Sequence, residues 1–252
     1  MMSRRGYQMT GTVAMRAFVT GGTRGIGRAI VEAILPRLDE LTVLAAHGSH
    51  IRELSRFVVG RYPQCRFDAI AHDLADLQGL ADKLSVWRDS AAGGRALDVL
   101  VLNAGTYTDG SLLEIKVVDY IHDLNVNLNS YLVAARELIP CLRRGKRPRI
   151  FMTGSTAAYE PYPMVPSYGV AKVGLRGLAV NLRRELAAER IGVTFISPGG
   201  TLTDMWEGEE LPPDRLLRPS DIGTLLSACL DLSEQAVVEE IIVRPMEGDI
   251  HE

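Results

Sequence analysis

Short apolar runs alternate with longer segments of helical periodicity along most of the chain. The runs are nearly continuous in apolar residues, which is typical of strands that are buried on both faces of a parallel sheet. Seven strands are predicted, at residues 16–20, 41–46, 66–71, 97–102, 149–153, 193–197 and 239–243.

The segments between these strands predict helices that cover both faces of the sheet. They span residues 25–35, 49–59, 77–90, 114–142, 167–190 and 221–232. No repeat, low-complexity segment or linker interrupts the alternation. We therefore expect one doubly wound α/β domain at residues 15–252, preceded by a flexible tail at residues 1–14.

Composition and charge narrow the class of protein. A chain of 252 residues with 46% hydrophobic and 23% charged residues is ordinary for one soluble α/β domain. The net charge of -3 provides no basic field that would attract nucleic acid or an anionic membrane. No apolar run approaches the 18 or so residues of a membrane-spanning helix, and the first residues lack the apolar core of a secretory signal.

The three cysteines, Cys65, Cys141 and Cys229, lie far apart and form no CxxC pair. They indicate free thiols in a reducing compartment, so we expect a cytoplasmic protein. The five histidines form no HxxxH or HxH pair, and we expect no metal site.

A glycine-rich turn joins the first predicted strand to the first helix, with Gly21, Gly22, Gly25 and Gly27 in the sequence TGGTRGIG. Glycines allow a tight turn and close approach of a ligand, and the N-terminus of the following helix suits a pyrophosphate. The spacing matches neither GxGxxG nor a P-loop. A glycine-rich turn without a ligand is the alternative interpretation.

Tyr168 and Lys172 lie four residues apart on a predicted helix, so the phenol and the ammonium share one face. The cation favours the phenolate and is expected to lower the pKa of Tyr168 from its usual value of about 10. Such a tyrosine can protonate a carbonyl oxygen or deprotonate an alcohol. The pair alone is weak evidence, because similar pairs occur by chance on solvated helices.

Together these stretches make the chain resemble the short-chain dehydrogenase/reductase family from Arg16 to Gly248. The turn matches the TGxxxGxG motif, and Tyr168 and Lys172 match YxxxK. Further matches are the NAG stretch at residues 103–105, Ser155 at 13 residues before Tyr168, Asn127, and Pro198-Gly199 followed by Thr203. Leu102 replaces the first asparagine of the NNAG motif, and Asn125 and Asn129 flank Asn127.

The resemblance implies a Rossmann fold and a catalytic tetrad. Tyr168 would exchange a proton with the substrate oxygen, while Ser155 donates a hydrogen bond to it. Lys172 would tune Tyr168 and bind the nicotinamide ribose. Asn127 would hold, through its backbone, a water that resupplies the proton. A nicotinamide cofactor would carry the hydride.

The choice between NADP and NAD depends on the end of the second strand. An NAD enzyme usually places an acid about 20 residues past the glycines, and here that stretch contains His47 and no acid. Arg24 adjoins Gly25, where it can pair a 2′-phosphate. We therefore favour NADP(H) and leave NAD possible. The expected cofactor contacts are Gly21, Thr23, Arg24, Gly25, Ile26, Gly27, His47, Asp73, Leu74, Asn103, Ala104, Gly105, Tyr168, Lys172, Pro198, Gly199, Thr201 and Thr203.

The expected substrate is a small carbonyl compound or secondary alcohol, in a partly aromatic pocket. Its expected lining is Tyr107, Ala157, Tyr159, Tyr162, Gly200 and Trp206. The competing interpretation is a non-catalytic nucleotide-binding sensor or scaffold, and a third is an isomerase or dehydratase on the same fold.

The helices that carry Asn127 and Tyr168 have more apolar residues than one face needs. These include Leu132 and Leu138 on the first, and Val170, Val173, Leu175 and Leu182 on the second. In relatives these two helices pair across a two-fold axis, so we expect a homodimer or homotetramer.

Overall fold

The computed structural model describes residues 15–250, apart from residues 92, 93, 161, 163, 207, 209, 210 and 213. The tail predicted at residues 1–14 lies outside the described residues.

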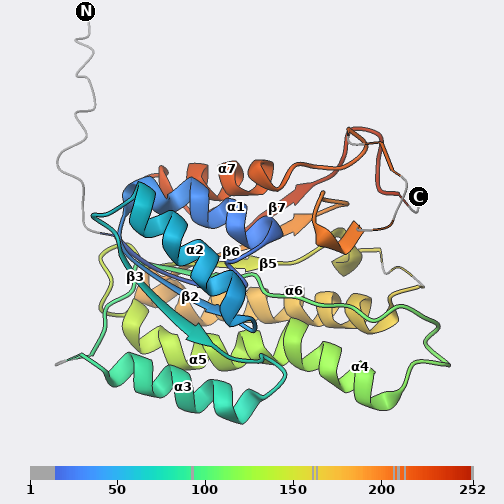
Figure 1. The fold of residues 1–252 in the computed structure, drawn as a ribbon, viewed down its shortest axis with the longest axis horizontal. Coiled ribbons are helices and arrows are strands. Elements are labelled where there is room, and N and C mark those ends of the chain that lie inside the picture. Colours follow the sequence, from blue (N-terminus) through green and yellow to red (C-terminus); the bar gives the residue numbers. More distant parts are fainter. Residues whose placement is uncertain are drawn as a thin grey trace, which may run out of the picture.

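A seven-stranded parallel sheet forms the centre of the molecule, in the order β3-β2-β1-β4-β5-β6-β7 (Figure 1). The strands are β1 (Met15–Thr20), β2 (Leu38–Ala45), β3 (Arg66–Ala71), β4 (Val99–Leu102), β5 (Arg149–Thr153), β6 (Gly192–Pro198) and β7 (Glu240–Val243). The prediction of seven parallel strands is confirmed. Strand order reverses between β1 and β4, and ligands of such sheets bind at the carboxyl ends of the strands beside this point.

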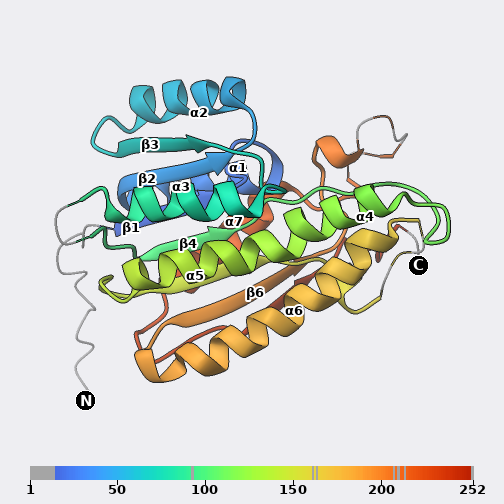
Figure 2. The same ribbon diagram turned by 90° about the horizontal axis from the view of Figure 1, so that it is seen from below.

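Helices cover both faces of the sheet, as the sequence predicted. On one face lie α1 (Gly25–Ile34), α2 (Gly48–Arg61) and α7 (Pro219–Leu230). On the other lie α3 (Leu77–Asp89), α4 (Val117–Leu124), α5 (Ser130–Leu142) and α6 (Pro166–Leu186), which Figure 2 shows from below. Among the described residues, no helix is long and apolar enough to cross a bilayer.

The single long helix predicted at roughly residues 114–142 is found without a break from Val117 to Leu142, but it is not a regular α-helix throughout. Helix α4 begins at Val117, and a π-helical turn (Asn125–Asn129) separates it from α5. The side-chain amide of Asn127 donates to the main-chain oxygen of Asp123 (2.9 Å), the acceptor that the backbone N–H of residue 127 would use in a regular α-helix. Turns of this kind often occur at functional sites.

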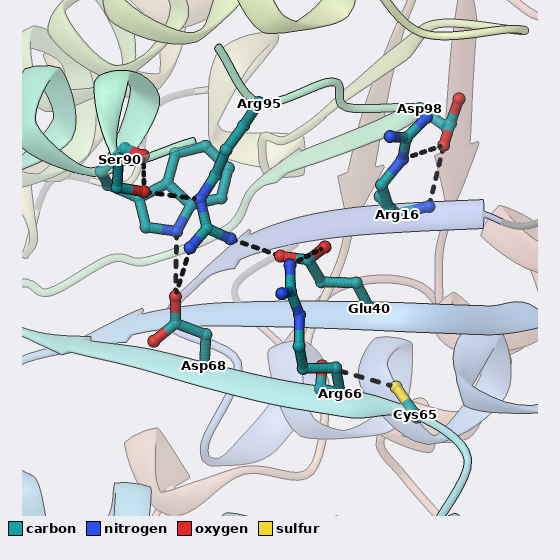
Figure 3. Close-up of polar contacts among 9 residues, drawn as sticks. Arg16, Glu40, Cys65, Arg66, Asp68, Ser90, Arg95 and Asp98 are labelled. Carbon is teal, nitrogen blue, oxygen red and sulfur yellow. Dashed lines mark hydrogen bonds and ion pairs between the residues drawn. The ribbon is translucent and has the colours of Figure 1, made fainter. Parts of the chain in front are cut away.

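A polar network ties the segment after α3 to the amino-terminal part of the sheet, away from the carboxyl ends (Figure 3). Arg95 binds Glu40 of β2, Asp68 of β3 (3.3 Å) and the hydroxyl of Ser90 (3.0 Å). Its guanidinium lies 4.7 Å from the ring centroid of Trp87. One largely buried cation therefore joins two strands and a helix.

We predict that Arg95→Met lowers the free energy of unfolding by about 1–3 kcal/mol, because Glu40 and Asp68 lose a partly buried charged partner. The matched control is Arg66→Met. Arg66 also binds Glu40 (2.5 Å), but its side chain is 67% exposed, so its loss should cost less than about 1 kcal/mol. Urea denaturation of the two variants measures the difference, and equal losses would contradict the assignment.

Candidate active site

Lys172 and Tyr168 lie on one face of α6, as their spacing predicted. Lys172 is only 2% exposed, and its Nζ donates to the main-chain oxygen of Thr153 at the end of β5 (3.0 Å). The same Nζ lies 5.2 Å from the ring centroid of Tyr168 and 5.7 Å from that of Tyr131. The ammonium is thus fixed between a strand end and two aromatic rings.

Ser155 reaches Tyr168 from a different element. It follows β5 and caps a short 3-10 turn (Thr156–Ala158), where its Oγ accepts from the N–H of Ala157 (3.1 Å). Ser155 also lies close enough to Tyr168 to lower the pKa of the phenol. Two hydroxyls therefore meet at the carboxyl end of β5.

Asn127 is fully buried in the π-helical turn, and its side chain closes a hydrogen-bonded loop. Its Nδ2 donates to the main-chain oxygens of Thr106 (2.7 Å) and Asp123 (2.9 Å), and its Oδ1 accepts from the N–H of Thr106 (3.2 Å). A Cβ on Gly105 would lie 2.9 Å from Asn127 Oδ1 and 3.9 Å from Lys172 Nζ. The segment after β4 therefore passes between Asn127 and Lys172.

Burial dominates the ionisation of the Tyr168–Lys172 pair. It lowers the pKa of Lys172 to about 7. It also raises the pKa of Tyr168, while the neighbouring hydroxyl of Ser155 acts in the opposite direction. The expectation that Lys172 lowers the pKa of Tyr168 below its usual value is therefore wrong for the protein alone. The cause is that both groups are desolvated and the lysine itself loses charge.

The glycine turn packs directly against the segment that follows β4. Gly21 has a positive φ of 66°, and a Cβ there would lie 2.7 Å from the Cα of Ala104. A Cβ on Gly27 would lie 2.1 Å from the Gly21 oxygen and 2.5 Å from Asn103 Nδ2. The Thr20 hydroxyl accepts from the N–H groups of Asn103 (3.0 Å) and Ala104 (3.3 Å). These contacts hold the two predicted cofactor stretches side by side.

Helix α1 begins at this turn, and its N-terminus is suited to bind an anion. Within the described chain, its N-cap residue Arg24 makes no side-chain capping bond, and its first turn contains no acid. Its first N–H groups and positive dipole end therefore face the turn without an acid from α1 itself. Together with the close-packed glycines, this set fits a pyrophosphate and hence the dinucleotide expected from the sequence; Thr23 and Ile26 lie in the same stretch.

Arg24, predicted to bind a 2′-phosphate, binds an acid of the protein instead. Its Nη1 lies 2.8 Å from Oδ2 of Asp204, and both side chains are about half exposed. His47 is the exposed N-cap residue of α2. A Cβ added to Gly48 would lie 3.5 Å from one Nη of Arg52, so a second guanidinium lies beside the first turn of α2. Sequence reasoning missed Asp204 and Arg52, although Arg52 follows Gly48 by four residues, about one helical turn, which was a usable signal.

The remaining cofactor residues occupy the carboxyl ends of β3 and β6. Asp73 is exposed beside the buried Leu74, just past β3. Pro198 ends β6, and the hydroxyl of Thr201 donates to the Gly199 oxygen (2.9 Å). A Cβ on Gly25 would lie 3.0 Å from the Thr203 methyl carbon, so this segment lies over the glycine turn.

The structure brings most of the predicted pocket residues to this end of the sheet but separates Tyr159 from them. Tyr107 donates to the Met205 oxygen (3.1 Å), Tyr162 shares a hydrogen bond with Thr156 (2.8 Å), and Ala157 is buried. Trp206 lies over Gly200, because a Cβ added to Gly200 would lie 3.4 Å from Cζ2 of Trp206.

The ring of Tyr159 instead lies 4.8 Å from the guanidinium of Arg176, one helical turn beyond Lys172, and packs on the core. Sequence reasoning missed Thr156 as the partner of Tyr162. Among the described residues, no three histidine, cysteine or acidic side chains are grouped as metal ligands.

Comparisons with known proteins agree with this geometry. Residues 15–212 match the family described as short chain dehydrogenase. The sepiapterin reductase of Chlorobaculum tepidum is 27% identical over 241 residues, which cover 93% of this chain and 97% of that protein. A 3-oxoacyl-(acyl-carrier-protein) reductase of Buchnera aphidicola is 30% identical over 190 residues, covering 75% of this chain and 74% of that protein.

Solved structures show the same fold. A short chain dehydrogenase from Burkholderia cenocepacia, crystallised with NADP, superposes with a TM-score of 0.80 at 26% identity. The match covers 92% of this chain and 96% of that one.

Because the pKa of Lys172 is low, replacing this lysine in the cofactor-free protein should change the free energy of unfolding by an amount that depends on pH. The folded pKa of about 7 lies below the unfolded value of about 10.4, so unfolding takes up a proton between these two pH values. The cost of burying the lysine is complete below pH 7, shrinks as the pH rises and disappears above about 10.4. Lys172→Met should therefore stabilise the protein more at pH 6.5 than at pH 9, by about 2–3 kcal/mol.

Urea denaturation of the wild type and of Lys172→Met at the two pH values measures this difference. Loss of the hydrogen bond to Thr153 costs the same at both pH values, so it does not affect the comparison. Lys83→Met is the matched control, because Lys83 also donates to a main-chain oxygen (2.8 Å, Ala71) but is exposed. The control therefore removes a comparable hydrogen bond without removing a buried side chain. If Lys172→Met changes the free energy of unfolding by the same amount at both pH values, the claim that the pKa of Lys172 is lowered is refuted.

Proposed function

The chain belongs to the short-chain dehydrogenase family, and we propose that it is an NADP(H)-dependent oxidoreductase that transfers hydride between nicotinamide and a carbonyl or secondary alcohol. The observation that carries this proposal is the meeting of Tyr168, Ser155 and the buried Lys172 beside the glycine turn. These groups lie at the carboxyl ends of the central strands, where ligands of such folds bind.

The nicotinamide, when bound, supplies or accepts the hydride. Tyr168 donates a proton to the substrate oxygen in reduction and accepts it in oxidation. Ser155, which contacts the phenol, donates a hydrogen bond to the same oxygen and stabilises its developing charge. Lys172, held by Thr153, is placed to bind ribose hydroxyls and to return a proton to Tyr168.

Asn127 contributes its backbone, because its side chain is fully used by Thr106 and Asp123. We propose that its main-chain oxygen holds the water through which Lys172 exchanges protons with solvent. A sensor or scaffold on this fold would be free to lose these groups. All four positions of the tetrad are filled, which favours catalysis over that alternative.

NADP(H) is the proposed cofactor. Two guanidinium groups, Arg24 and Arg52, lie near where a 2′-phosphate would bind, and the chain has no acid at the end of β2. The Burkholderia cenocepacia relative was crystallised with NADP. NAD remains the alternative cofactor.

Reduction of a small carbonyl compound is the proposed direction, because the Chlorobaculum tepidum and Buchnera aphidicola relatives described above are both named reductases. Their names give different substrates and do not select one for this chain. We also propose a reducing compartment such as the cytoplasm, where Cys65, Cys141 and Cys229 stay free.

The first test is Tyr168→Phe, which deletes one hydroxyl and leaves the ring. NADPH consumption with a panel of ketones, quinones and acyl thioesters identifies a usable substrate. On that substrate the variant should lose about 10²–10⁴-fold in turnover, because the alkoxide loses its proton donor. NADPH binding should be unchanged, which fluorescence titration measures. Turnover close to the wild-type rate would make Tyr168 a packing residue.

The second test concerns the 2′-phosphate. Arg24→Ala should weaken NADPH binding and leave NADH binding unchanged. Asp204→Asn frees Arg24 from its acid and should tighten NADPH binding up to about five-fold, the range expected for an exposed ion pair. The matched control is Asp204→Asn in the Arg24→Ala background, where the gain should vanish. Equal affinity for NADPH and NADH in the wild type would reject the cofactor assignment.

The third test concerns assembly, which we propose to be a homodimer or homotetramer. Among the apolar residues from which an oligomer was predicted, three are buried in the core of the subunit: Leu138, Leu175 and Leu182. An exposed apolar set nevertheless remains on α4, α5 and α6: Val117, Val118, Ile121, Leu132, Val170 and Val173. Light scattering should give a dimer or tetramer, and Val173→Glu should dissociate it. Val59→Glu, at a similarly exposed valine on α2, is the control that should not; a monomeric wild type would contradict the proposal.

A further inference from the structure

A buried carboxylate on α4 has no role in the mechanism described so far. Asp123 is 1% exposed, and its Oδ2 accepts a short hydrogen bond from the hydroxyl of Ser167 (2.6 Å). Its Oδ1 is buried and has no hydrogen-bond partner among the described residues; His122 Nδ1 lies 3.7 Å away. A buried carboxylate is costly unless charges and hydrogen bonds compensate for it, so its place in the fold needs a reason.

Asp123 touches both helices that carry the tetrad. Its side chain binds Ser167, which immediately precedes Tyr168 in the first turn of α6. Its main-chain oxygen accepts from the side-chain amide of Asn127 (2.9 Å). One residue therefore connects the turn that presents Tyr168 with the turn that presents Asn127.

The first turn of α6 also lacks an anchor of its own. Its N-cap residue Val165 offers no side-chain cap, Pro166 follows, and within this fully described helix the first turn contains no acid. Asp123 on α4 supplies this anchor through its hydrogen bond with Ser167. The hydrogen bond to Ser167 fixes where that turn sits against α4.

We propose that Asp123 is a positioning residue that acts through Ser167 to hold Tyr168 against Ser155. The link to turnover rests on the proposed oxidoreductase function, whereas the effect on the geometry of Tyr168 does not. A misplacement of about 1 Å in a reacting group can cost about 10²-fold in rate. Tyr168 stands directly after the anchored Ser167, so a shift of this turn moves the phenol.

The test uses Asp123→Ala, Asp123→Asn and Ser167→Ala in the full chain. The first readout needs no substrate: NMR of [ζ-¹³C]tyrosine follows the titration of Tyr168, whose signal is assigned by its absence in Tyr168→Phe. Because Ser155 lowers the pKa of Tyr168, movement of the phenol away from Ser155 in Asp123→Ala should shift the titration to higher pH. Asp123→Asn keeps an oxygen that accepts from Ser167, so it should titrate like the wild type.

The second readout is steady-state kinetics on a substrate found with NADPH. Asp123→Ala and Ser167→Ala should each lower kcat about 10–10²-fold, with little change in KM or in NADPH affinity. The double variant should lose no more than either single variant, because both remove one contact. Asp123→Asn should recover most of the rate.

Arg95→Met is the matched control for a loss of stability, because Arg95 lies in the network at the opposite end of the sheet. It should lower the melting temperature and leave kcat unchanged. The proposal is overturned if Asp123→Ala leaves both the Tyr168 titration and kcat at wild-type values. It is also overturned if Asp123→Asn lowers kcat as much as Asp123→Ala does. The effect would then come from the charge of Asp123 and not from its hydrogen bond with Ser167. If the wild type reduces nothing, the proposed function fails, while the NMR titration still decides the position of Tyr168.

Discussion

The site depends on the hydrogen bond from the buried Lys172 to the main-chain oxygen of Thr153. A lysine that is 2% exposed exchanges water for one carbonyl and the faces of two aromatic rings, and its pKa falls accordingly. The bond fixes α6 relative to the end of β5. It thereby also fixes Tyr168 relative to Ser155, which follows that strand.

Small residues and backbone groups do the rest of the positioning. The segment after β4 passes between Asn127 and Lys172 only because residue 105 has no side chain. The Asn127 amide then binds both backbone groups of Thr106, so the segment cannot shift without breaking buried hydrogen bonds. On the other side, Thr20 holds Asn103 and Ala104 against the glycine turn. The cofactor half and the catalytic half are thus connected through one short stretch of chain.

The sequence predicted the parts of this structure that follow from local periodicity and local spacing. The seven strands are short apolar runs, and the shared face of Tyr168 and Lys172 follows from a separation of four residues. It could not predict the π-helical turn, since that turn depends on Asn127 meeting Thr106 from a distant segment. The pairing of Arg24 with Asp204, 180 residues later, and the direction of Tyr159 away from the pocket are likewise tertiary. The pKa of Tyr168 was misjudged because burial cannot be read from the spacing of two residues.

The π-helical turn between α4 and α5 also has a consequence for how the chain tolerates insertions and deletions. A π turn contains one residue more than the α turn it replaces, and one residue corresponds to about 100° of rotation about the helix axis. The turn therefore offsets the face of α4 that meets α6 from the face of α5 that meets the sheet. Deleting a single residue between Asn125 and Asn129 would give a more regular helix while rotating Asp123 away from Ser167. In this stretch, the number of residues therefore constrains the protein as well as the identity of Asn127.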